Sequence, residues 1–163
     1  MMIKNARLAA AAVALALVAI PTAQAQTATQ TVTFAVNAIN QIGITGAPSL
    51  TIVTAVAGSA PTSVTDASAV WAVTTNQTGA KITASIPLAM PAGLTLLSNL
   101  AAPAAATSAG FLALGTVAVD VVTGITRLAQ GSLGVSYRLD ATPAAGVVAS
   151  ASRIVTYTIT GGV

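Results

Sequence analysis

The residues that carry most enzyme chemistry are scarce in this chain, and their spacing groups none of them. The chain has 163 residues with no histidine and no cysteine, and its only carboxylate side chains are Asp66, Asp120 and Asp140. A serine or threonine hydroxyl is a weak nucleophile without a neighbouring base, and Lys81, beside a predicted turn, is the only lysine after the first few residues. A paired-carboxylate mechanism needs two aspartates to converge, and their spacing does not predict it. We therefore expect no enzymatic activity.

Metal and cofactor sites are not predicted either. Transition-metal sites are built from histidine and cysteine. Calcium needs several clustered oxygens, and the stretch VTDAS around Asp66 offers one carboxylate. No glycine-rich phosphate loop with its lysine is present. We expect no cofactor and no metal, and we expect the single tryptophan, Trp71, to be the core aromatic packed between sheets.

The first 25 residues have the three parts of a secretory signal peptide, of a kind that looks bacterial. Lys4 and Arg7 form a basic start, and residues 8–20 are an unbroken apolar stretch that Pro21 ends. The residues that define the predicted cleavage are Ala23, Ala25 and Gln26, the last being the first mature residue. We therefore expect a secreted protein, extracellular or on the cell surface, with the periplasm as the alternative. The membrane is a partner only through this signal.

Charge is very low once the signal is removed. The mature chain keeps four basic residues against three acidic ones, a net charge of +1. Nucleic-acid binding needs a dense basic field, which these scattered cations do not provide. A surface made mostly of threonine, serine, alanine, glutamine and asparagine favours association, so we expect the main partner to be a second copy of the chain.

Alternating apolar and polar residues predict β-strands throughout the mature chain. The first is the clearest, because Val32, Phe34 and Val36 alternate with polar residues over 31–38. The remaining predicted strands cover residues 41–45, 49–55, 69–76, 81–87, 93–101, 114–125, 132–142 and 152–160, with loops at 58–68, 102–110 and 143–151. Residues 69–76 and 81–87 are predicted to form a hairpin. About eight or nine short strands without a helix predict one all-β domain over 26–163, an antiparallel two-sheet β-sandwich.

The strand count, the spacing and a predicted closing hairpin resemble an immunoglobulin-like sandwich. The domain lacks the cysteine pair that antibody-type members pack around a tryptophan. The alternating mature N-terminus, TATQTVTFAVNAI, is similar to the donor segments of secreted pilin-type subunits. This resemblance implies a segment, residues 30–38, that completes the sheet of another subunit through Val32, Phe34 and Val36.

Two interpretations of that segment lead to different functions. Residues 31–38 are either the first strand of their own sandwich or a strand given to the next copy, and repeated head-to-tail exchange builds a filament. We expect a self-assembling filament or matrix subunit that uses strand complementation or edge pairing. The alternatives are a monomeric, exported, immunoglobulin-like binding module and a small outer-membrane β-barrel.

Overall fold

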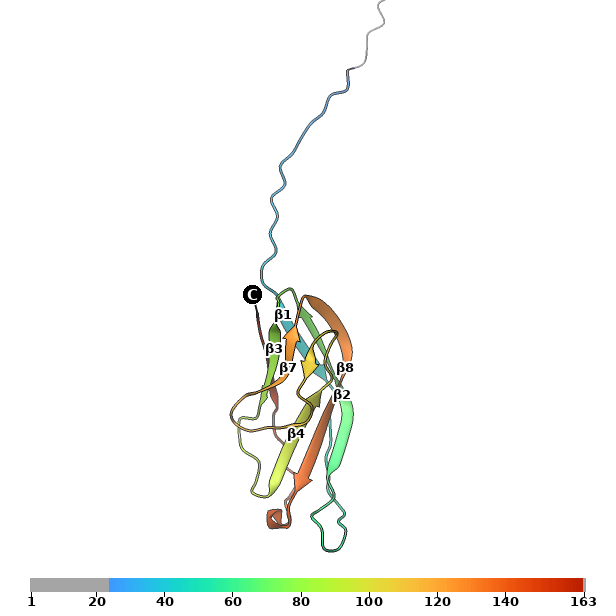
Figure 1. Cartoon of the computed structure of the whole chain (residues 1–163), viewed down its shortest axis with the longest axis vertical. Coiled ribbons are helices and arrows are strands. Elements are labelled where there is room, and N and C mark those ends of the chain that lie inside the picture. The colour runs from blue at the N-terminus through green and yellow to red at the C-terminus, as the bar shows by residue number, and fades with distance from the viewer. Residues whose placement is uncertain (1–23, 163) are drawn as a thin grey trace, which may run out of the picture. The chain divides into compact units, whose positions relative to one another are not determined.

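The computed structural model describes residues 24–162. Most of the predicted signal peptide, Ala23 included, lies outside these residues, whereas Ala25 and Gln26 lie in an exposed stretch without secondary structure. The described part belongs to two units, residues 24–35 and residues 36–162, and the second unit contains every strand (Figure 1). The sandwich below is this second unit.

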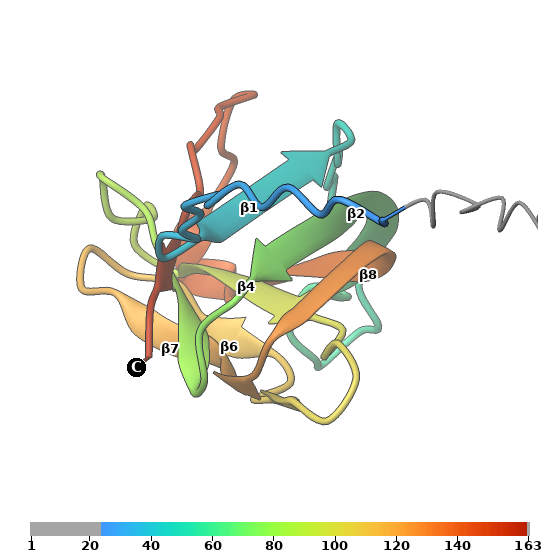
Figure 2. The same cartoon turned by 90° about the horizontal axis from the view of Figure 1, so that it is seen from above.

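The larger sheet has five antiparallel strands. Their order across the sheet is β1-β2-β8-β4-β6. The strands are β1 (Asn40–Thr45), β2 (Val64–Thr75), β8 (Leu128–Ala141), β4 (Leu94–Leu100) and β6 (Leu112–Ala113). The long strands β2 and β8 form its centre, and β1 is an edge strand that pairs only with β2. Figure 2 shows β1, β2 and β8 side by side in this layer.

The second sheet has four antiparallel strands in the order β5-β7-β3-β9. The strands are β5 (Thr107–Ser108), β7 (Val119–Ile125), β3 (Ala80–Ser85) and β9 (Thr156–Thr160). The edge strand β9 pairs only with β3. A 3₁₀ turn, η1 (Pro143–Ala145), lies between β8 and β9. The predicted two-sheet sandwich of about nine strands is confirmed.

The core lies between the two sheets, where alternate residues of each strand point inward. On β2 the buried row is Ala69, Trp71, Val73 and Thr75, and on β3 it includes Ile82. This period of two is the one that a sheet buried on one face produces. Trp71 is 1% exposed, and its indole nitrogen donates to the carbonyl of Ala101 at 3.1 Å. The indole therefore fills the core and still has a partner for its polar atom.

Several local predictions are wrong. The predicted hairpin does not form, because β2 and β3 belong to opposite sheets and the turn between them crosses the sandwich. No closing hairpin forms either, since β8 and β9 are also in opposite sheets. The predicted loop at 58–68 is too long because β2 begins at Val64. Residues 31–38 and 49–55 are not strands in this structure; the second stretch has one isolated bridge, Ala55 to Pro61.

Candidate functional site: an open groove at the edge of the sandwich

The segment before β1 exposes the row of apolar side chains that the sequence singled out. Residues 24–39 contain no secondary structure and form no ladder with any described residue. Val32, Phe34 and Val36 are 72%, 89% and 78% exposed. Three large apolar side chains on one row of an unpaired segment are costly in water, since burying each contributes roughly 1.5–3 kcal/mol.

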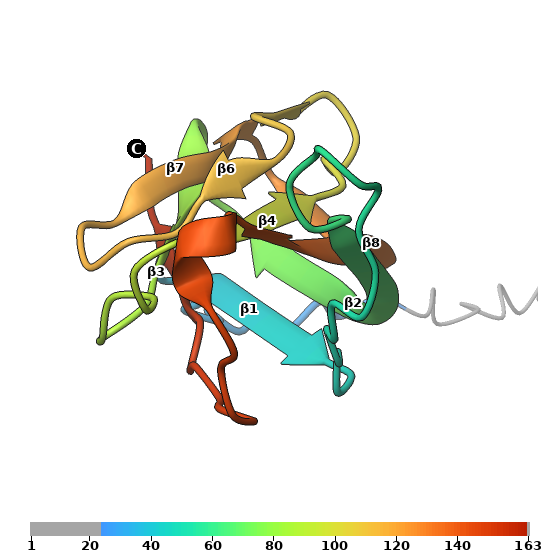
Figure 3. The same cartoon turned by 90° about the horizontal axis from the view of Figure 1, so that it is seen from below.

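A groove of about 970 Å³ opens at one edge of the sandwich. One side is the stretch that follows β1, residues 48–55, which we call the β1 wall. The other side is the stretch that precedes β9, residues 148–155, which we call the β9 wall. Figure 3, seen from below, shows the backbone of the two segments that contain these walls: η1 with the chain that follows it, and the teal connection from β1 to β2. Apolar side chains that line the groove include Leu50, Ile52, Leu94, Leu96, Leu139 and Val155.

The β1 wall is strand-like but unpaired. Residues 50–53 all border the groove; Leu50 and Ile52 are half-buried whereas Thr51 and Val53 are exposed, so burial alternates as it does in a strand. No backbone hydrogen bond joins residues 50–53 to another described residue. The wall is fixed at its ends, where the Ser49 amide donates to the Asp66 carboxylate at 2.9 Å and the Thr62 amide donates to the Thr54 carbonyl at 2.8 Å.

Gly46 lies against β2 at the point where the β1 ladder ends. Gly46 directly follows β1 and has a φ of +123°, a conformation that favours glycine. A Cβ atom on it would lie 2.6 Å from the Ala69 Cα of β2. The position therefore requires glycine, and the chain beyond it forms the β1 wall.

The β9 wall is unpaired in the same way. Val155 lines the groove and is half-buried, while its neighbour Ile154 is 73% exposed and does not line it. Residues 147–155 make no backbone ladder with the described chain. Arg153, the single charged residue among those lining the groove, donates to the Ala89 carbonyl at 3.1 Å and to the Ser152 carbonyl at 2.9 Å. Its guanidinium is thereby held at backbone carbonyls.

The groove lies where the two edge strands separate. β1 and β9 contact each other, and Gly161, just after β9, lies against the Asn40 side chain at the start of β1. The strands therefore run in opposite directions at this edge, as the nearby C-terminal end in Figure 1 indicates. Beyond Thr45 on one side and before Thr156 on the other, no described strand fills the space between the sheets. The backbone groups of residues 50–53 and 147–155, which border this space, have no backbone partner in the described chain, and unpaired backbone of this kind can bind a further strand.

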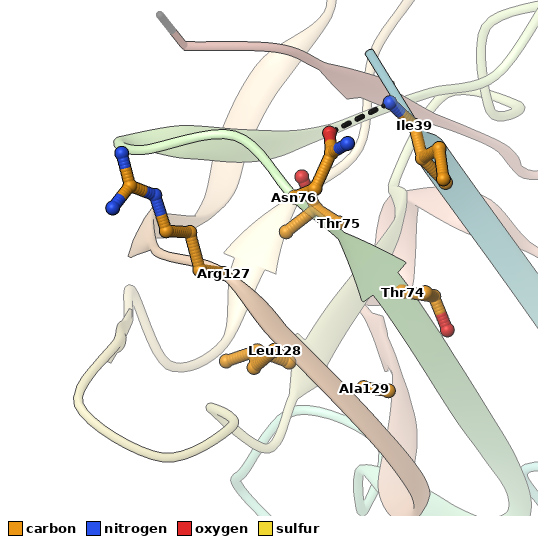
Figure 4. Close-up of a pocket in the computed structure, with 7 residues that line it drawn as sticks. All are labelled: Ile39, Thr74, Thr75, Asn76, Arg127, Leu128 and Ala129. Atoms are coloured by element: carbon orange, nitrogen blue, oxygen red, sulfur yellow. Dashed lines mark hydrogen bonds between the residues drawn. The ribbon is translucent and has the colours of Figure 1, made fainter. Parts of the chain in front are cut away.

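A second feature lies at the opposite end of β1, where the N-terminal segment joins the sandwich. A hollow of about 320 Å³ is lined there by Ile39, Thr74, Thr75, Asn76, Arg127, Leu128 and Ala129 (Figure 4). Asn76 Oδ1 accepts a hydrogen bond from the Ile39 amide at 2.8 Å, and Asn76 Nδ2 donates to the Asn37 carbonyl at 2.7 Å. The hollow itself contains no cluster of groups suited to chemistry.

No group of metal-ligating side chains occurs in the described residues. Within residues 24–162 there is also no helix long and apolar enough to cross a membrane. Comparisons with protein-family models, curated proteins and solved structures find no match to this chain.

Only the donor half of this site was predicted from the sequence. The alternating pattern identified Val32, Phe34 and Val36, whose side chains the structure leaves exposed. It missed the groove, although the alternation of Leu50 and Ile52 was a signal for the β1 wall. It also missed Asn76, which was assigned only to a turn.

Proposed function

We propose that the protein is a secreted structural subunit that assembles by strand complementation. Residues 30–38 of one copy enter the edge groove of the next and add a strand between the β1 wall and the β9 wall. The observation that carries this proposal is the groove with an unpaired stretch of backbone on each side, one of which, the β1 wall, alternates in burial as a strand does. Repetition of one such head-to-tail contact does not close on itself, and builds a filament.

The chemistry of the segment suits the chemistry of the groove. An added strand gains main-chain hydrogen bonds on both sides, and its alternate side chains enter apolar pockets. Residues 24–65 contain no charged side chain, so the segment enters without burying a charge. Its nine residues extend about 30 Å, and the eight residues of the β1 wall extend about 26 Å, at about 3.3 Å per residue.

The strand order gives separate support. An immunoglobulin-like domain of the constant type has strands A, B, E and D in one sheet and C, F and G in the other. The order β1-β2-β8-β4 corresponds to the first set, and the neighbours β3 and β9 correspond to C and F. The place of strand G is beside β9, and the groove lies next to the residues that lead into β9, although no residue of β9 itself lines it. A donated strand would fill that place.

The distribution of charge favours self-association. Lys81 and Asp120 form one exposed ion pair, and Arg138 and Asp140 form another. The two pairs leave few uncompensated charges on the sandwich to repel a second copy. The proposal has no catalytic residue, and its functional residues are Val32, Phe34 and Val36 with the groove.

The test is light scattering with size exclusion, and negative-stain microscopy, on the chain from Gln26 to Val163 without detergent. We expect regular filaments from this chain and only monomers from Phe34→Asp or from a deletion of residues 26–38. Thr33→Asp is the matched control, because it adds the same charge to the opposite face of the segment, and we expect it to assemble. A monomeric parent chain would contradict the proposal and favour a monomeric binding module. Normal filaments from Phe34→Asp would instead indicate edge pairing elsewhere.

A further inference from the structure

Asn76 holds the last residues of the N-terminal segment by three hydrogen bonds. Its backbone amide donates to the Ile39 carbonyl at 3.2 Å, and its side-chain oxygen accepts from the Ile39 amide at 2.8 Å. Its side-chain nitrogen donates to the Asn37 carbonyl at 2.7 Å. Together these bonds fix residues 37–39 against the end of β2, and we call this contact the Asn76 clamp (Figure 4).

The orientation of the Asn76 amide is determined by its neighbours. Its oxygen accepts from the Ile39 amide and from Gln77 Nε2 at 2.7 Å, so a flipped amide would place donors against donors. Behind it, the Thr75 hydroxyl donates to Asn40 Oδ1 at 2.7 Å and accepts from the Gln77 amide at 3.0 Å. The clamp is therefore part of a connected polar network with its partners in place.

An unclamped segment has a competing site on its own molecule. The outer side of β1 has no hydrogen-bonded strand, although β9 contacts β1 near Asn40, and its unpaired backbone groups can bind an extended segment. Residues 30–36 reach that edge if the chain reverses at residues 37–39 and forms a hairpin with β1. The hairpin requires a turn at the residues that the clamp holds to Asn76.

A segment that folds back onto β1 cannot reach the groove of its own molecule. The groove walls begin beyond Thr45, about 20 Å along β1 from Asn40 at about 3.3 Å per residue. A reversed segment would use most of its nine residues alongside β1 and could not fill the groove of its own molecule. It would also be unavailable to the next copy.

We propose that Asn76 is a positioning residue that prevents the segment from folding back onto β1 and so keeps it available to a second copy. This inference rests on the proposed function, because the clamp matters for assembly only if the segment is donated; it limits the donated strand to residues 30–36, since the clamp holds residues 37–39 on their own molecule. It also makes a prediction about the monomer alone, which holds whether or not chains assemble.

The test measures how quickly chymotrypsin cleaves after Phe34 in monomers isolated by size exclusion. In the parent monomer we expect rapid cleavage, because Phe34 is exposed. In Asn76→Ala we expect cleavage to slow by roughly two- to fivefold, since losing two side-chain hydrogen bonds raises the ratio of folded-back to open segment about tenfold from a parent in which the open form predominates. Asn76→Asp retains the acceptor for the Ile39 amide and loses the donor to Asn37, so we expect an intermediate rate.

Asn37→Ala is the matched control. The clamp uses the carbonyl of Asn37 and not its side chain, so this variant should be cleaved at the parent rate. Trp71 fluorescence checks that each variant is folded. Equal cleavage rates in the parent, Asn76→Ala and Asn37→Ala chains would overturn the clamp while leaving the proposed function intact. Failure of the parent chain to assemble would overturn the proposed function. The cleavage rates would then still decide whether the clamp holds the segment open.

Discussion

The hydroxyl of Tyr157 on β9 donates to the hydroxyl of Tyr137 on β8 at 3.1 Å, and this bond joins the two sheets beside the groove. The Tyr157 oxygen also hydrogen-bonds to Ser98 Oγ on β4, and Ser98 is fully buried. Three hydroxyls thus form a polar chain across an otherwise apolar core. Each is a buried polar group that depends on the others for its hydrogen bonds.

Tyr157→Phe should destabilise the sandwich more than Tyr137→Phe. The first change leaves the buried Ser98 hydroxyl without its tyrosine partner, at a cost of about 1–3 kcal/mol in the free energy of unfolding. The second leaves the Ser98–Tyr157 bond in place and should cost about 1 kcal/mol. Urea unfolding followed by Trp71 fluorescence measures both changes, and equal losses would show that Ser98 does not depend on Tyr157.

The same cluster predicts sensitivity to high pH. Burial raises the pKa of Tyr157 well above its usual range, and burial also raises the pKa of Tyr137. An unfolded tyrosine has a pKa of about 10. Because the folded pKa values lie above the unfolded ones, the stabilisation is fully present below about pH 10 and is lost as the pH rises further.

Phenolate absorbance should therefore rise in step with the loss of native Trp71 fluorescence during an alkaline titration. Ionisation of both tyrosines at about pH 10 in a chain that stays folded would contradict the burial of these hydroxyls.

Gly46→Ala should destabilise the fold at the point where the chain leaves β1. The new Cβ would lie 2.6 Å from the Ala69 Cα, and the φ of +123° is strained for alanine, so we expect a loss of about 1–3 kcal/mol or more. Gly43→Ala on β1 is the control, because no atom lies within 4 Å of the position its Cβ would occupy. Thermal unfolding compares the two, and a neutral Gly46→Ala would contradict the close approach of the chain to β2.

Asp66→Asn should remove a contribution to the free energy of unfolding that requires the ionised carboxylate and is therefore lost at low pH. Hydrogen bonds lower the pKa of Asp66 below its usual value; the largest effect comes from the Ser68 hydroxyl, followed by the amides of Ser49 and Ser68. Since the folded pKa is lowered, the stabilisation is present above the unfolded pKa of about 4 and is lost as the pH falls through the folded value.

The parent chain should therefore unfold at a higher urea concentration than Asp66→Asn at pH 7, and this difference should shrink near pH 2. A difference that is the same at both pH values would mean that the carboxylate does not hold the β1 wall through the Ser49 amide.

The sequence predicted the sandwich because alternation with a period of two reports which face of a strand is buried. The alternation does not show which strands are hydrogen-bonded neighbours. Strands β2 and β3 bury alternate residues whether they form a hairpin or face each other from opposite sheets, so the predicted hairpin was wrong while both strands were right. Residues 49–55 show the same limit, since Leu50 and Ile52 are half-buried in alternation but no strand of the described chain pairs with them.

The groove could not be predicted because its walls come from segments about a hundred residues apart and become neighbours only when the sheets pack. Asn76 was missed for a different reason. An asparagine in a polar turn is common, and only the three-dimensional path of residues 37–39 gives its amide two further partners.

The central claim is that the exposed segment of one copy enters the groove of another, and mixing two complementary variants tests it most directly. Ile52→Lys places a charge in the groove and leaves residues 30–38 intact; Ile52 lines the groove without packing on the core. Phe34→Asp damages the segment and leaves the groove intact. Ile154→Lys is the control, because it is the same substitution at an exposed position that does not line the groove.

Light scattering of each variant alone and of the mixture gives the result. We predict that Ile52→Lys and Phe34→Asp are each monomeric, that Ile154→Lys assembles like the parent chain, and that an equal mixture of the first two forms one-to-one dimers and nothing longer. Dimers are expected because the mixture retains one usable segment and one usable groove per pair. Filaments from Ile52→Lys alone, or a mixture that stays monomeric while the parent chain assembles, would contradict the account.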